Sequence, residues 1–377
     1  MNLNRAAAIA WKEALQIRRD VRSIIIVVAM PVILMFMFGY GVSFDIKHLP
    51  VYVFDRENSQ QSRDFLALFR SSEYFAVVRS VDNYRDLVAA IDRGDCRMAI
   101  VVPPRFSQLL REGGPVPVQA ILDGTDGNSA NVGMGYADAI ASVYSQQVQI
   151  GWLRRQGMRP LDPPISVAAR TWFNEDLESL ANIVPGVVVI VMAVVGTFLT
   201  SLTIAREWER GTMEQLIATP VTPLELMLGK LAPYLVIGLL DTALCAGMGV
   251  WWFGVPFRGS VGVLFLSATL FLSVVLALGY MLSVALKSQL AASQASMIAT
   301  FLPAFLLSGF IFPIDQMPVV LQVVTHIIPA RYFMTIMRAV FLKGTPLMLL
   351  YQQLAALALF ALVLTVAATR AFQKRLR

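Results

Sequence analysis

The chain has 377 residues, of which 56% are hydrophobic and only 15% are charged, so its composition departs far from that of soluble proteins. Its formal net charge is +6, but residues 43–178 carry 14 basic and 17 acidic side chains, and the remainder carries 17 basic and 8 acidic ones. The excess of positive charge therefore lies in the segments that border apolar runs. This distribution is typical of membrane proteins and argues against nucleic-acid binding.

Residues 1–22 have the pattern of an amphipathic helix. Leu3, Ala7, Trp11 and Leu15 recur at a spacing of four, and basic residues occupy other positions of the same stretch. The pattern predicts an interfacial helix on the cytoplasmic leaflet, and the alternative is a plain extension of the first membrane span.

Six apolar runs are long enough to cross a bilayer, which needs about 20 residues per helix. The first lies in residues 23–42 and the other five follow residue 178. Helices satisfy their own backbone hydrogen bonds in lipid, so we predict a polytopic α-helical membrane protein with six transmembrane helices. The first run has no evident cleavage site and is predicted to stay as an anchor. The later runs are Ser179–Ala205, Leu231–Phe257, Gly259–Leu286, Ser288–Ile314 and Gly344–Thr369.

Residues 43–178 form a polar insertion between the first and second spans. Short apolar segments alternate with helical patterns, which predicts an α/β domain with a largely parallel sheet. Cys96 and Cys245, and likewise His48 and His326, lie in separate segments, so we expect neither a disulfide framework nor a metal site.

The distribution of lysine and arginine predicts the orientation of the spans. With the N-terminus in the cytoplasm, thirteen basic residues flank the spans on the inner side. Only four fall in short outer loops: Arg258, Arg331, Arg338 and Lys343. Basic residues favour the cytoplasmic side, so both termini are predicted to be cytoplasmic and residues 43–178 to be external.

The loop between the second and third spans, residues 206–220, is dense in charge. Thr212 with Gln215, and Thr222 with Glu225, fit the capping box that starts a helix. We predict a short docking helix here, and the alternative is a solvated loop end whose charges pair with one another.

Two further features concern the membrane interior and the outer side. Asp241 is an acidic residue in the middle of a span, and it is a candidate for substrate or ion contact or for a hydrogen bond between helices. Several prolines interrupt residues 313–343, which predicts an outer re-entrant segment. Arg331 and Arg338, seven residues apart, are expected to share one helix face and either attract anionic substrate or lipid, or extend toward lipid headgroups.

The run Ala205–Leu216 resembles the signature of type-2 ABC exporter permeases, and Pro313–Tyr332 resembles the segment before the last span in that family. The resemblance covers essentially the whole chain and is strongest to bacterial multidrug-efflux permeases with a large periplasmic domain. It implies a subunit of the bacterial inner membrane that exports hydrophobic or amphipathic molecules such as drugs.

The resemblance also implies partners. An ABC ATP-binding subunit would bind ATP and Mg, a second permease copy or paralogue would complete the core, and a periplasmic adaptor (membrane fusion protein) would meet the external domain. The chain contains no G-x-x-x-x-G-K-[ST] motif, so we expect any ATP to be hydrolysed by the partner. We accordingly expect no catalytic residue, cofactor or metal in this chain. The residues implied in coupling to the ATPase are Arg206, Glu207, Trp208, Glu209, Arg210, Gly211, Thr212 and Glu214.

Three alternative functions fit parts of the same pattern. One is an ABC exporter of lipid or glycoconjugate. Another is a membrane-anchored receptor with the external domain as sensor, although the tail after Arg370 has only seven residues. The third is a secondary transporter driven through Asp241, although the internal repeats common in that class are not evident.

Overall fold

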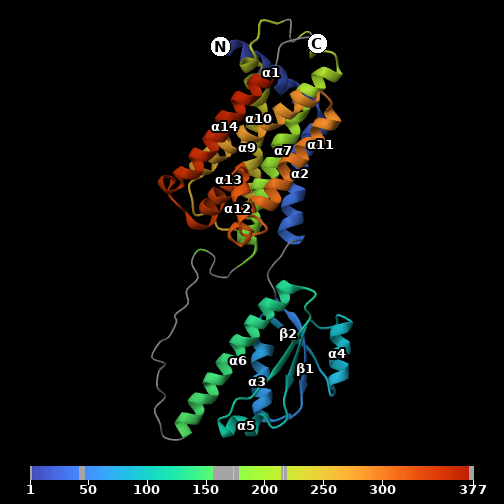
Figure 1. Cartoon of the computed structure of the whole chain (residues 1–377), viewed down its shortest axis with the longest axis vertical. Helices are drawn as coiled ribbons and strands as arrows, with labels where there is room; N and C mark the ends of the chain where they lie inside the picture. Colours follow the sequence, from blue (N-terminus) through green and yellow to red (C-terminus); the bar gives the residue numbers. More distant parts are fainter. Residues whose placement is uncertain are drawn as a thin grey trace. The chain divides into compact units, whose positions relative to one another are not determined.

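The computed structural model describes residues 2–41, 47–155, 173, 178–213, 215 and 219–372. The chain forms two compact units (Figure 1). One comprises Met1–Ser43 with Arg170–Arg377, and the other comprises Phe44–Ala169. The first contains the long apolar helices and the second contains a β-sheet, so the polar insertion folds as a unit with its own core.

Nine α-helices of the described residues build the first unit, and five of its helical segments are long and apolar enough to cross a membrane: α7, α9, α10, α11 and Leu347–Ala371. The stretch Val27–Gly41 of α2 is apolar as well. A multi-pass membrane protein is therefore confirmed, and the count of six spans stays a prediction. The helices are α1 (Leu3–Arg19), α2 (Val21–Gly41), α7 (Leu180–Glu209), α9 (Pro223–Trp251), α10 (Val261–Leu286), α11 (Gln289–Leu307), α12 (Val319–Thr325), α13 (Pro329–Arg338) and α14 (Tyr351–Ala371).

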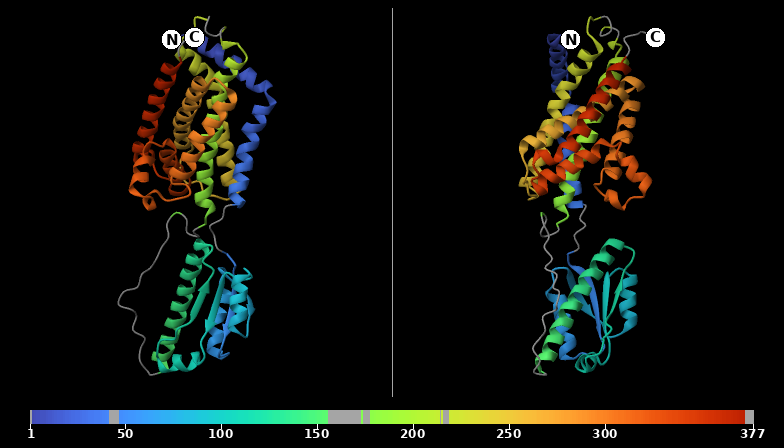
Figure 2. Two further views of the ribbon diagram at one scale, coloured as in Figure 1. Left: turned by 45° about the vertical axis from the view of Figure 1, so that its right-hand side comes forward. Right: turned by 60° about the vertical axis from the view of Figure 1, so that its left-hand side comes forward.

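Helix α7 forms the centre of this bundle (Figure 2). In the most apolar 18 residues of α7, 89% of the residues are buried inside the protein. The corresponding share for Leu347–Ala371 is 11%, because that segment faces outward. Close approach of helices requires small residues. A Cβ built on Gly279 of α10 would lie 2.5 Å from the Thr197 carbonyl oxygen of α7, so only glycine allows this contact.

The segment predicted to be re-entrant contains a sharp bend. Val319–Thr325 and Pro329–Lys343 meet at 85°, and the second helix continues from α13 into a π-helical turn, Ala339–Lys343. Two short 3-10 helices, Ile314–Gln316 and Leu347–Leu350, flank the pair. A bend of this size fits a re-entrant loop or a broken span, so the prediction stays open.

The second unit contains a four-stranded sheet of order β2-β1-β3-β4. The central strand β1 pairs parallel with β2 and with β3, and β4 pairs antiparallel with β3. The predicted α/β fold with a largely parallel sheet is therefore observed. The elements are β1 (Leu49–Asp55), α3 (Gln60–Ser71), β2 (Phe75–Ser80), α4 (Tyr84–Asp92), β3 (Met98–Val102), α5 (Phe106–Glu112), β4 (Gln119–Leu122) and α6 (Gly127–Arg155).

Helices cover both faces of this sheet. Helices α3, α5 and α6 pack on one face through residues such as Phe65, Phe106 and Ala137. Helix α4 packs on the other through Leu87, against Ala99 and Val101 of β3. Because β3 is covered on both faces, all five of its residues are buried and apolar, as is typical of strands in parallel sheets.

Candidate coupling site

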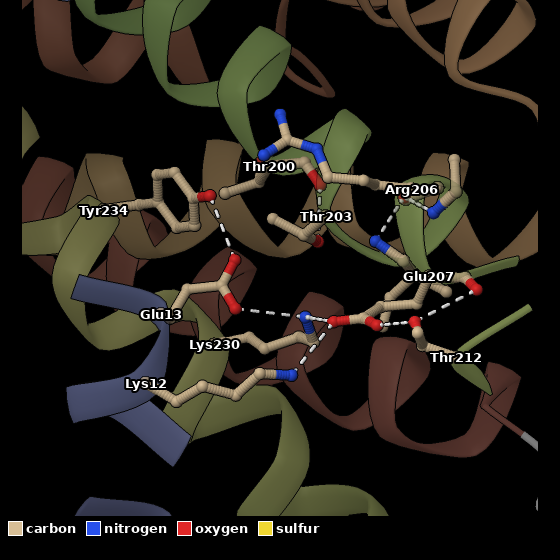
Figure 3. A network of polar contacts seen from close by, with 12 residues as sticks. Lys12, Glu13, Thr200, Thr203, Arg206, Glu207, Thr212, Lys230 and Tyr234 are labelled. Carbon is tan, nitrogen blue, oxygen red and sulfur yellow. Dashed lines mark hydrogen bonds and ion pairs between the residues drawn. The ribbon is translucent and has the colours of Figure 1, made fainter. Parts of the chain in front are cut away.

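A buried polar network joins α1, the end of α7 and the start of α9 (Figure 3). Lys230 is only 1% exposed, and its Nζ lies 3.1 Å from Glu13 Oε2 and 3.2 Å from Glu207 Oε1. The Tyr234 hydroxyl donates a hydrogen bond of 3.1 Å to Glu13 Oε1. One buried cation of α9 thus holds a carboxylate from each of the two neighbouring helices.

The amphipathic helix α1 can bring Glu13 to Lys230 because α9 has a residue without a side chain, Gly229, where the two helices meet. Glu13 follows Ile9 by four residues and precedes Ile17 by four, so the three share the inner face of α1. A Cβ built on Gly229 would lie 2.7 Å from Ile9 Cβ and 2.8 Å from the Ala6 carbonyl oxygen. Glycine at 229 therefore lets α1 pack close to α9, directly beside Lys230.

The charges of the network balance. Lys12, whose side chain is 57% exposed, approaches Glu207 Oε1 at 3.4 Å, and the Thr212 hydroxyl donates to the same carboxylate. Two lysines therefore face two glutamates. Buried ions lose their hydration and are stable only when paired, so removal of one member leaves the others uncompensated.

A second group of contacts anchors the beginning of α1. The backbone N–H of Asn2 donates to Glu225 Oε1 at 2.6 Å, and the Arg5 guanidinium donates to the Pro220 carbonyl oxygen at 2.6 Å. Glu225 also completes the predicted capping box with Thr222, which is confirmed. The start of α9 and the start of α1 are thus connected by the same carboxylate.

The charged loop differs from its prediction in one respect. Arg206–Glu209 is the last turn of α7 and does not belong to a separate short helix. The span extends past its uncharged run because these side chains find partners inside the protein: Arg206 pairs with Asp20 at 3.4 Å. Glu207 is 5% exposed and belongs to the network.

The next two residues of this turn also make internal contacts. Glu209 Oε1 accepts a hydrogen bond of 2.7 Å from the backbone N–H of Gln289, at the start of α11. The Lys287 ammonium lies 4.5 Å from the centre of the Trp208 ring. The last turn of α7, Arg206–Glu209, therefore connects this helix to its neighbours.

The exposed part of the loop begins at Glu209, the last residue of α7. Arg210 and Gly211 are exposed, Gly211 has φ of +69°, and Thr212 is half-buried. A positive φ favours glycine, which lets the chain turn away from the helix. Glu214 lies outside the described residues. The predicted contact with an ATPase stays a prediction. Of the described residues implied in it, Glu209, Arg210 and Gly211 are exposed.

Asp241 lies on α9 apart from the network. It is 4% exposed, and its Oδ2 has no hydrogen-bond partner among the described residues. The cavity beside it, between Met192 and Leu272, measures only about 10 Å³, at the lower limit for a single water. This cavity is too small to hold a cargo molecule.

The two arginines of the outer segment make backbone contacts. Arg331 Nη1 donates to the Gln322 carbonyl oxygen at 3.3 Å and also to the Thr325 hydroxyl, which fixes the bend between α12 and α13. Arg338 Nη2 donates to the Gly309 carbonyl oxygen at 2.6 Å, which connects α13 to the end of α11. Although they are seven residues apart on one helix, they bind different parts of the chain.

Sequence reasoning missed Glu13 and Tyr234, which were not among the predicted site residues. The basic residues of the network, Lys12 and Lys230, were used only to predict the orientation of the spans. A signal was available, because Glu13 is the only acidic residue in the first nineteen positions. No group of three or more His, Cys, Asp or Glu suited to a metal occurs in the part of the chain that the structure describes.

The second unit contains a separate apolar cleft of about 760 Å³. It lies between the second half of α6 and the loop before β4, and its lining includes Phe106, Tyr144 and Trp152. A cleft of this volume and composition is typical of sites that bind an apolar side chain or small molecule.

Comparison with known proteins identifies relatives of the whole chain. Residues 22–370 match the family model described as ABC-2 family transporter protein. The probable multidrug ABC transporter permease YbhS of Escherichia coli K12 is 40% identical over 345 residues, which cover 91% of this chain and 90% of YbhS. The probable multidrug ABC transporter permease YbhR of the same organism is 26% identical over 367 residues, 97% of each chain. The inner membrane transport permease YhhJ of that organism is 26% identical over 316 residues, 82% of this chain and 80% of YhhJ.

Proposed function

The chain belongs to the ABC-2 family of transporter proteins, and on this basis we propose that it is the permease subunit of an ATP-driven exporter of hydrophobic or amphipathic compounds, drugs among them. The observation that carries the proposal is the match to two full-length relatives named as multidrug permeases. These names favour drug export over the lipid, glycoconjugate and receptor alternatives. The sequence has no P-loop, so a separate ABC subunit supplies ATP hydrolysis with its Mg.

The polar network suits the transmission of force from such a subunit. The ATPase binds at the loop that follows α7, where Arg210 and Gly211 are exposed. Lys230 joins Glu207 of α7 to Glu13 of α1, and pulling these ions apart would leave buried charges unpaired. The ends of α1, α7 and α9 therefore move together, and displacement of the loop reaches all three helices.

The remaining parts of the assembly follow from the same proposal. Six spans place both termini in the cytoplasm of a bacterial inner membrane and the α/β unit in the periplasm, as the positions of basic residues support. A second permease, identical or a paralogue, completes the membrane core. The apolar cleft lined by Tyr144 and Trp152 is the feature of the α/β unit best suited to contact a periplasmic adaptor.

Charge reversal in the loop tests the contact with the ATPase. We expect Arg210→Glu to reduce the amount of ATPase subunit that copurifies with the tagged permease, because the exposed guanidinium would become a carboxylate at the contact. Arg370→Glu, an exposed arginine near the end of α14, is the matched control and should leave the complex intact. If Arg210→Glu keeps both the bound ATPase and drug export, the loop is not the docking site.

A further inference from the structure

An apolar groove lies between α1 and α9, on the other side of α1 from Lys12. Its volume is about 620 Å³, and Val27 of α2 also lines it. Trp11 and Ala14 line it from α1, and Ala232 and Val236 line it from α9. All of these residues belong to one compact unit.

The groove exists because small residues face one another across two helices that the buried network holds in a fixed position. Ala14 is adjacent to Glu13, and Ala232 lies two residues after Lys230, so the contact between Glu13 and Lys230 sets the spacing of the groove walls. The rim is apolar and open, since Trp11 is 69% exposed and Val236 is 58% exposed. Such surfaces are stable against lipid chains rather than water.

The groove has one charged lining residue, Arg18. Its side chain is exposed and makes no hydrogen bond or ion pair with the described residues. Asp20, two residues later, pairs with Arg206 in the last turn of α7, just beyond the uncharged run of that helix. Arg18 therefore lies at the boundary between the apolar and the polar part of the bundle. The other lining residues of the groove, on α1, α2 and α9, are apolar.

We propose that this groove binds an anionic phospholipid, with an acyl chain between α1 and α9 and the phosphate on Arg18. A guanidinium binds phosphate oxygens with two parallel hydrogen bonds, and basic residues beside membrane helices bind acidic headgroups. Trp11 supplies the amphipathic ring that such sites have at headgroup depth. The site is distinct from the exporter's coupling to ATP, and lipid bound here contacts the helix that carries Glu13.

Lipid titration of the full chain tests the headgroup. The purified permease in detergent is titrated with phosphatidylglycerol or phosphatidylcholine, and bound lipid is counted by native mass spectrometry. Arg18→Gln should weaken phosphatidylglycerol binding about five-fold, the factor expected from ~1 kcal/mol per arginine near an anionic headgroup, and leave phosphatidylcholine unchanged. Arg19→Gln is the matched control, because Arg19 is exposed on the same helix and does not line the groove. Equal losses in both variants would overturn the proposal.

A second pair of variants tests the acyl chain. Ala232→Leu fills the groove and should weaken both lipids, whereas Ala243→Leu changes an exposed alanine of α9 outside the groove and should not. Thermal unfolding without added lipid verifies that each variant is folded. Unchanged lipid binding by Ala232→Leu would overturn the proposal, and so would displacement of phosphatidylglycerol by excess glycerol phosphate, which lacks acyl chains.

Discussion

Helix α9 buries both Lys230 and Asp241, and the surroundings of these two side chains differ. Lys230 is 1% exposed and contacts two carboxylates, one from α1 and one from α7. Asp241, eleven residues further along the helix, is 4% exposed, and its Oδ2 has no hydrogen-bond partner among the described residues. The charge of Lys230 is compensated by carboxylates from two neighbouring helices. No described residue donates a hydrogen bond to Asp241 Oδ2.

This difference shows why an ionisable residue in a span is ambiguous in the sequence alone. Such residues are costly in the membrane and are therefore candidates for function. Lys230 avoids the cost by recruiting Glu13 and Glu207, whereas Asp241 faces Met192 and Leu272. Lys230 therefore has a structural role, and Asp241 remains the candidate for contact with a proton or another ion.

The largest effect is expected from removal of the paired cation. Lys230→Met leaves Glu13 and Glu207 buried without their shared partner, and we expect a loss of about 3–5 kcal/mol in the free energy of unfolding. The measurement is denaturant unfolding of the purified permease in detergent. Lys12→Met, which removes the 57% exposed partner of Glu207, should cost less than ~1 kcal/mol. Equal losses would show that the network does not depend on burial.

A compensating variant sharpens this result. Adding Glu13→Gln and Glu207→Gln to Lys230→Met removes all three charges, so no buried ion is left without a partner. We expect the triple variant to recover about 2 kcal/mol of the stability that Lys230→Met loses. If the triple variant is less stable than Lys230→Met, the ion pairs are not the reason for the loss.

The unpaired carboxylate should respond in the opposite direction. Asp241→Asn removes a charge that no described residue compensates, so we expect the free energy of unfolding at pH 8 to rise by about 1 kcal/mol. Drug export should persist if ATP drives it, and resistance of cells to a lipophilic drug measures this. A folded Asp241→Asn permease that exports nothing would favour a carrier driven by an ion gradient through this residue.

A carboxylate outside the spans gives the smallest effect. Burial raises the pKa of Glu57, but hydrogen bonds from Ser107 and Ser59 and the nearby Arg111 outweigh burial, so the pKa lies below its ordinary value of 4.5. In the acid range the unfolded state therefore binds more protons. The stabilisation is present above pH 4.5 and is lost as the pH falls through the folded pKa.

Comparison of the wild type with Glu57→Gln tests this dependence. Of the six tryptophans, only Trp152 lies in the α/β unit. With the other five replaced by phenylalanine in both proteins, fluorescence reports unfolding of that unit between pH 6 and pH 3. The variant should be less stable than the wild type at pH 6 by less than ~1 kcal/mol and nearly equal to it at pH 3. A difference that does not shrink toward pH 3 would show that Glu57 contributes in another way than through its ionised form.

Much of the architecture could be predicted from the sequence because it depends on local patterns. Apolar runs of the length of a bilayer locate α7, α9, α10 and α11, since a backbone in lipid has to satisfy its own hydrogen bonds. Alternation of strands and helices predicts the mostly parallel sheet. The capping box at Thr222 and Glu225 was predicted for the same reason, because it involves residues only three apart.

The candidate site could be predicted only in part. The sequence by itself determined the charged loop and its similarity to exporter permeases, both of which are contained in one short segment. The contacts of the buried network were decided by the tertiary structure, because Lys230 and Glu13 are 217 residues apart. The same holds for the groove beside Arg18, which requires α1 to lie against α9. Periodicity shows which face of a helix is apolar, but the identity of the helix packed against that face depends on the three-dimensional fit of the whole bundle.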